Sequence, residues 1–91
     1  MDQYVIVVES GYKTTSANYR ITPTEPMGLQ EAQDLYAALR SGTSKHLPAE
    51  PGATVVELSD RQFLRIRSVR AATVLDRVTM GRATMQSSTS R

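Results

Sequence analysis

The 91-residue sequence contains no cysteine, and this absence excludes disulfide bonds, thiolate metal sites and cysteine nucleophiles together. A chain without cysteine suits a reducing compartment, and we expect a cytoplasmic protein. The N-terminal segment MDQYVIVVES has no basic region, and its apolar run stops after five residues. It therefore predicts neither a signal peptide nor a membrane-spanning segment, and we expect no membrane partner.

Histidine is almost as scarce, because His46 is the only one. A metal site needs several converging ligands, and His46 has no histidine or cysteine companion, so we expect a structural or solvated side chain. The stretch GYKTTS, residues 11–16, is similar to the end of a phosphate-binding loop, but Tyr12 stands where the glycine before the lysine is required. We therefore expect no enzymatic activity, no cofactor and no bound metal.

The chain is long enough for one domain. A domain of this size buries only roughly 60 % of the surface that its unfolded chain exposes, so its core is thin and a partner subunit would add to it. We expect a single compact domain over residues 1–80. The remaining segment GRATMQSSTSR, residues 81–91, is small and polar and is expected to form a flexible tail.

Two strands are predicted near the N-terminus. The run YVIVV, residues 4–8, is continuously apolar and mostly β-branched, which is typical of a strand that is covered on both faces. After the polar segment YKTTSAN, the alternation of NYRIT predicts a second strand. The two strands are expected to form a hairpin whose long tip exposes Tyr12 and Lys13, a good pair for contact with a partner.

The period then changes to that of a helix, over residues 29–40. Its apolar positions share one side of a 3.6-residue repeat: Leu29, Ala32, Leu35, Tyr36 and Leu39. Gly28 precedes this helix and Gly42 follows it, which matches the residues preferred at the two helix ends. We expect the apolar side to cover a sheet, while a homodimer formed through this helix is the alternative.

The segments TVVEL and RQFLRIRSVR are expected to pair as antiparallel strands. The register that sets Glu57 opposite Arg65 also places apolar residues opposite each other, namely Leu58 with Leu64 and Val56 with Ile66. This register predicts that Ile66 turns inward. The opposite side would then face solvent, and it carries Arg61, Phe63, Arg65 and Arg67.

Residues 68–80 fit two structures. Apolar residues follow helical spacing after Ser68, but β-branched residues are frequent, and we favour a strand that bends near Ser68. The predicted fold class is therefore α+β, with a small antiparallel sheet of four or five strands and one helix packed on a face.

Charge is distributed unevenly along the chain. The net charge is only +2, but the half after Lys45 has seven arginines against four acids and no lysine. Arg61, Arg65 and Arg67 could contact phosphates while Phe63 stacks on a base, which makes nucleic acid the alternative partner. Because arginine and aromatic residues also dominate protein interfaces, and the net charge is small, we expect a protein partner instead.

Three segments together resemble the small accessory proteins that phages of actinobacteria encode: YVIVVESGYKTTSANYRI, MGLQEAQDLYAALRSG and FLRIRSVRAATVLDRV. The likeness lies in a short strand–loop–strand, a helix that opens with a Leu-x-Glu-Ala pattern and an arginine-rich terminal strand pair. It implies a non-enzymatic protein that binds one bacterial host protein and inhibits or redirects it. It implies no particular site residues.

Overall fold

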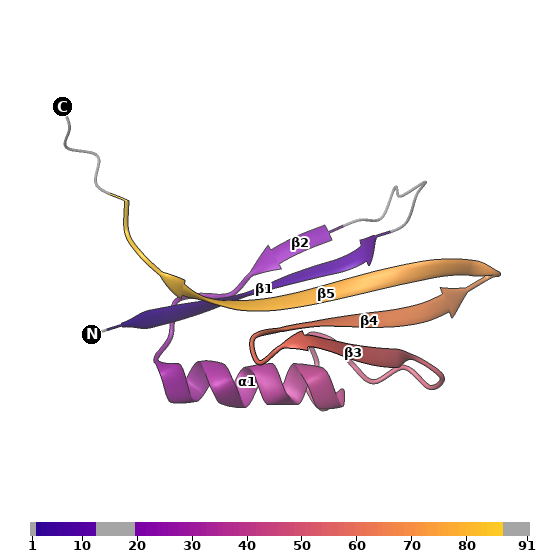
Figure 1. Ribbon diagram of the computed structural model, residues 1–91, viewed down its shortest axis with the longest axis horizontal. Coiled ribbons are helices and arrows are strands. Elements are labelled where there is room, and N and C mark those ends of the chain that lie inside the picture. Colours follow the sequence, from indigo (N-terminus) through magenta and orange to yellow (C-terminus); the bar gives the residue numbers. More distant parts are fainter. Residues whose placement is uncertain (1, 13–19, 87–91) are drawn as a thin grey trace.

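The computed structural model describes residues 2–12 and 20–86, and these form one helix and one five-stranded antiparallel sheet. The α+β prediction is confirmed. Along the chain the elements are β1 (Gln3–Tyr12), β2 (Arg20–Pro23), α1 (Leu29–Ser41), β3 (Thr54–Ser59), β4 (Gln62–Val69) and β5 (Ala72–Ala83). The strand order in the sheet is β2-β1-β5-β4-β3, and α1 packs across β1 and β5 (Figure 1).

The predicted N-terminal hairpin is present, because β1 and β2 pair antiparallel with Val8 opposite Thr22. The chain beyond β2 stays attached to β1: the Tyr4 and Met27 backbones exchange hydrogen bonds of 2.7 and 2.9 Å. The hydroxyl of Thr24 also accepts a hydrogen bond from the Ile6 amide at 3.0 Å. These contacts place residues 24–27 beside β1 and deliver the chain to the start of α1.

The predicted glycines flank helix α1. Gly28 occupies the N-terminal cap, and Gly42 ends the helix in the left-handed region at φ 83°. A Cβ atom on Gly42 would also lie 2.5 Å from the Cβ of Ala49. Both the positive φ and this close approach therefore require glycine at position 42. The Ala49 amide donates to the Gly42 carbonyl at 3.1 Å, which folds the loop of residues 43–53 back onto the helix end.

The core lies between α1 and the sheet. Ile6, Phe63 and Val78 come from the three central strands and are completely buried. The ring of Tyr36 meets Phe63 edge-on, with ring centroids 5.4 Å apart. Such a contact stabilises beyond the area it buries. Phe63 therefore belongs to the centre of the core.

The prediction that Phe63 and Arg65 face solvent is wrong. Phe63 has no exposed surface and Arg65 is 7 % exposed, whereas Ile66 on the opposite side of β4 remains partly exposed. The register differs as well: Val56, not Leu58, lies opposite Leu64, and Glu57 lies opposite Phe63. The shift is two residues, with an irregularity between Glu57 and Ser59, so the grouping of residues by face is as predicted.

Phe63 and Arg65 lie on the core side of β4 because a carboxylate on the neighbouring strand pairs with Arg65. Asp76 lies directly opposite Arg65 in the β4–β5 ladder and is completely buried. A buried arginine is costly alone, but an ion pair with full hydrogen bonding offsets much of that cost. Phe63 and Arg65 can thus share the core side.

Residues 68–80 contain no helix, but they are not one bent strand: β4 ends at Val69, and β5 begins at Ala72 after a turn at Arg70 and Ala71. Val69 pairs with Ala72, so Arg70 and Ala71 form a two-residue hairpin turn with φ 51° and 67°. Positive φ at both positions suits the right-handed twist of the strands and normally calls for glycine or asparagine. The turn is formed here by two residues that strain the backbone.

We expect Ala71→Gly to raise the free energy of unfolding by about 0.5–1 kcal/mol, because glycine adopts the left-handed region without the Cβ clash. Urea denaturation followed by circular dichroism measures the change. Ala72→Gly is the matched control: Ala72 lies in β5 outside the positive-φ turn, so the same substitution there should lower stability. A lower stability for Ala71→Gly would contradict the turn geometry.

Strand β5 also extends past the predicted domain boundary at residue 80. Gly81, Arg82 and Ala83 continue the ladder opposite Val5, Tyr4 and Gln3, so the expected tail does not begin at Gly81. Pairing with β1 supplies the backbone hydrogen bonds that a small, polar segment cannot provide alone. Among the described residues, no helix has the length and apolar character needed to span a membrane.

Candidate binding cleft

The Asp76 carboxylate organises the helix side of the sheet. Its Oδ2 accepts hydrogen bonds from Nε of Arg65 and Nε of Arg67, each at 2.9 Å. Its Oδ1 accepts from the Ser10 hydroxyl and the Gly11 amide at 3.0 Å, and from Nη2 of Arg67 at 3.3 Å. One carboxylate therefore joins β1, β4 and β5 through five hydrogen bonds.

These contacts determine the charge of Asp76. Burial alone would raise the pKa of its carboxyl, but the hydrogen bonds from Arg67, Arg65, Gly11 and Ser10 outweigh burial and hold the pKa below the ordinary value. The same hydrogen bond from Arg67 to Asp76 raises the pKa of the Arg67 guanidinium, against the opposing effect of burial. Asp76 and Arg67 thus stabilise each other in the charged form.

Arg65 and Arg67 also hold the loop that follows α1. Nη1 of Arg65 donates to the Pro48 carbonyl at 2.6 Å, and Nη1 of Arg67 lies 3.6 Å from Oε1 of Glu50. Together with the contact of Ala49 to the helix end, these bonds fix residues 46–50 beside the sheet. The loop thereby becomes a wall next to the Asp76 cluster.

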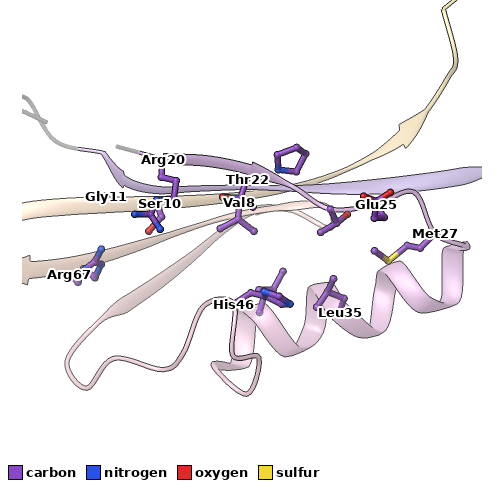
Figure 2. A pocket seen from close by; sticks show the side chains of 13 residues that line it. Val8, Ser10, Gly11, Arg20, Thr22, Glu25, Met27, Leu35, His46 and Arg67 are labelled. Atoms are coloured by element: carbon purple, nitrogen blue, oxygen red, sulfur yellow. The ribbon is translucent and has the colours of Figure 1, made fainter. Parts of the chain in front are cut away.

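A cleft of about 710 Å³ opens between this loop, α1 and the inner face of β1 and β2 (Figure 2). Its volume is typical of a ligand site. Val8 extends from the sheet toward α1, while Leu35 and His46 lie on the opposite wall (Figure 2). The full lining is Val8, Ser10, Gly11, Arg20, Thr22, Pro23, Thr24, Glu25, Met27, Leu35, Leu39, His46 and Arg67.

The two ends of the cleft differ in charge. Arg20 and Arg67 lie at the end near Ser10, whereas Glu25 lies at the other end beside Met27 (Figure 2). Arg67 is held in place by Asp76, and Arg20 is an exposed side chain on the edge strand β2. Between the ends the cleft is lined by Val8, Leu35 and Leu39, and the polar residues Thr22 and Thr24 also line it. Such a cleft can bind an apolar chain that carries an anionic group at one end.

The structure separates the residues predicted to form a contact surface. Arg61 is exposed, and its guanidinium lies 5.5 Å from the centre of the Tyr4 ring, a cation–π contact. Phe63 is core, and Arg65 is enclosed by Asp76 and the loop. Arg67 alone reaches the cleft.

Of the two residues predicted to form the hairpin tip, only Tyr12 belongs to the described residues. Tyr12 ends β1 opposite Leu75, and Lys13 lies outside the described residues. The chain leaves β1 after Gly11 and Tyr12 and enters β2 at Arg20, and both Gly11 and Arg20 line the cleft.

Sequence reasoning missed Arg20 and His46 as lining residues and Asp76 as an organising residue. Asp76 had a detectable signal, because it stands between Val74 and Val78 on one face of an alternating strand. A lone carboxylate at an apolar position indicates a buried charge with a cationic partner nearby. Arg20 and His46 had no comparable signal, since their proximity depends on how the loop folds.

Within residues 2–12 and 20–86, no group of three histidine, aspartate or glutamate side chains converges in a geometry that could hold a metal ion. Comparison of the chain with protein-family models, with curated proteins and with solved structures gives no match in any of the three. The functional interpretation therefore comes from the geometry of the cleft and of the sheet.

Proposed function

We propose that this protein is a non-enzymatic binding module that holds an acidic, aliphatic segment of a partner protein in the cleft between the sheet and α1. The observation that carries the proposal is the combination of an apolar wall with cationic side chains at one end of the same cleft. The resemblance to phage accessory proteins favours a bacterial host protein as the partner. A cytoplasmic location remains part of this proposal.

The apolar wall supports an aliphatic side chain as the anchor. Val8 and Leu39 are buried at the base of the cleft, and Leu35 and Met27 are partly exposed beside them. Each buried methylene of a partner side chain would contribute about 0.8 kcal/mol. An aliphatic residue is therefore favoured over a polar residue at this position.

The cationic end supports a carboxylate close to that anchor. Arg67 is pre-positioned, because its Nε and Nη2 atoms bind Asp76, while its Nη1 points toward the more exposed Glu50. Arg20 adds a guanidinium whose charge no described carboxylate pairs at salt-bridge distance. Guanidinium groups bind carboxylates through paired hydrogen bonds, which would orient the segment in the cleft.

Nucleic acid binding is the less supported reading. Of the three arginines expected to contact phosphates, Arg65 is buried, and Arg67 lines the cleft, whose lining does not include Arg61. Phe63 is completely buried and would have to leave the core to stack on a base. A phosphate backbone requires several cations on one exposed face.

We expect the fluorescently labelled protein, applied to an array of random heptapeptides, to select peptides in which an acidic residue lies within two positions of leucine, isoleucine or methionine. Fluorescence anisotropy with the best such peptide then gives the Kd. Arg20→Glu and His46→Glu, both at exposed positions of the cleft, should each weaken this binding by about tenfold or more.

Arg82→Glu is the matched control, because it makes the same change of charge at an exposed residue outside the cleft. It should leave the Kd within about twofold of the parent. Selection of peptides without acidic residues would contradict the proposal, as would unchanged affinity in both cleft variants. Tighter binding of a labelled thymidine oligonucleotide than of any peptide, weakening steeply with salt, would favour the alternative partner.

A further inference from the structure

The sheet face opposite α1 carries aliphatic side chains on all five strands. Rows of paired residues show this directly, since Val56, Leu64 and Arg77 are neighbours across three strands and Ile66 lies opposite Leu75. Each aliphatic side chain of this set is partly or largely exposed. The open face, as we name it, consists of Val5, Val7, Ile21, Val56, Leu64, Ile66 and Leu75.

The sequence pattern shows that this face is built to be covered. The run YVIVV in β1 is typical of a strand with cover on both sides, and α1 covers only the side of Tyr4, Ile6 and Val8. Val5 and Val7 point to the other side, where no described element packs (Figure 1). Within residues 2–12 and 20–86, a monomer leaves this second apolar layer without cover.

The charge of the open face favours a second copy of this chain over a charged partner. Its charged residues within the described range are Glu9 and Arg77, which lie opposite each other in the β1–β5 ladder. They form a bidentate ion pair of 2.6 and 2.9 Å. The charges of the described residues on this face therefore balance, and an apolar surface with balanced charge is complementary to itself, as a two-fold interface requires.

The size of the open face meets the minimum for such an interface. Five strands spaced about 4.8 Å apart, with about six residues of about 3.3 Å each, give a plane of roughly 500 Å² per copy. Two copies would then bury roughly 1,000 Å², which is about the minimum for a specific interface, so we expect a weak dimer. Stacked sheets pack about 10 Å apart with strands inclined by about 30°.

We propose that two copies of this protein pack their open faces together in a β-sandwich dimer. The dimer leaves both clefts on its outer sides, so it is independent of the proposed peptide binding. The Glu9–Arg77 pair becomes buried at the centre, and its loss of water weakens the dimer. Aliphatic contacts on both sides of that pair hold the two sheets together.

Sedimentation equilibrium from micromolar to near-millimolar concentration tests the proposal. We expect a concentration-dependent mass that approaches twice the monomer mass of 10.0 kDa. Leu64→Glu and Ile21→Glu, one central and one at the 55 % exposed rim, should each weaken dimerisation by about tenfold or more, with the larger loss for Leu64→Glu. Val55→Glu, on the other side of the sheet, is the matched control and should leave the dimer intact.

The Glu9–Arg77 ion pair allows a second test, in which a double substitution should strengthen dimerisation. Replacing Glu9 and Arg77 together by leucine should strengthen dimerisation about tenfold or more, whereas Arg77→Leu alone should weaken it. Circular dichroism melting curves show that each variant is folded. A protein that stays monomeric at every concentration would overturn the proposal. A dimer that Leu64→Glu and Ile21→Glu leave unchanged would place the interface elsewhere and would overturn it equally.

Discussion

Asp76→Asn is expected to lower the free energy of unfolding by about 3–5 kcal/mol, because it removes the counter-charge of two arginines on the helix side of the sheet. The asparagine keeps the size of aspartate, but its amide N–H₂ replaces one oxygen that accepts hydrogen bonds from arginine. Arg65 is 9 % exposed at its side chain and cannot recover its hydration without opening the loop at Pro48. Urea denaturation at neutral pH measures the loss.

Asp60→Asn is the control for this prediction. Asp60 lies in the exposed turn between β3 and β4, and the same chemical change there should alter stability by less than about 0.5 kcal/mol. Equal, small effects of the two substitutions would show that the Asp76 cluster contributes little. A large effect at position 76 alone confirms that the cluster stabilises the domain.

The Asp76 carboxylate also makes the free energy of unfolding depend on pH. The pKa of Asp76 is held below its ordinary value of 3.8 in the folded protein, so the unfolded chain takes up this proton more readily. The stabilisation is complete at pH values above about 4 and is lost as the pH falls through the folded pKa. Unfolding free energies measured from neutral pH to about pH 2 should decline for the parent, and Asp76→Asn should lack that part of the decline.

Phe63→Ala is expected to lower the free energy of unfolding by about 3–5 kcal/mol, because it empties the centre of the core. Phe63 has no exposed surface, and its ring contacts Tyr36 across the sheet–helix interface. Thermal melting and urea denaturation measure the change. A loss of this size is expected only if Phe63 lies in the core. It therefore distinguishes the observed packing from the sequence-based prediction, in which Phe63 faces solvent.

Leu58→Ala is the matched control for the core. Leu58 is 52 % exposed, so truncation there should cost less than about 1 kcal/mol. If Phe63→Ala cost as little as Leu58→Ala, Phe63 would lie on the solvent side and the face assignment of β4 would be reversed. The two substitutions lie on adjacent strands, which keeps the comparison local.

The elements of this protein follow from local sequence. Helix α1 was predictable because its apolar spacing and its flanking Gly28 and Gly42 are local signals that need no tertiary partner. The N-terminal hairpin and the grouping of residues on β3 and β4 by face were predictable for the same reason, since alternation determines which side chains share a side. The two-residue turn at Arg70 and Ala71 was not, because neither residue is typical of positive φ.

The binding regions were less predictable than the elements. Arg65 was expected to face a partner, but it is enclosed by Asp76 and the loop, whereas Arg67 binds Asp76 and also lines the cleft. The cleft joins Arg20 from β2, Leu35 from α1 and His46 from a loop, and only the folded chain places these residues together. The spacing of residues in the sequence does not predict which distant segments lie close together. The cleft could therefore not be predicted from it.

By itself, the sequence determined that this chain forms strands and one helix, and which side chains lie together on each side of a strand. It did not determine which side of the sheet is the core, because both sides of β1 and β4 carry apolar residues. The tertiary structure decided this by placing α1 over one side and Asp76 next to two arginines. The physical reason is that a charge can be buried when a distant part of the chain supplies its counter-charge and hydrogen bonds.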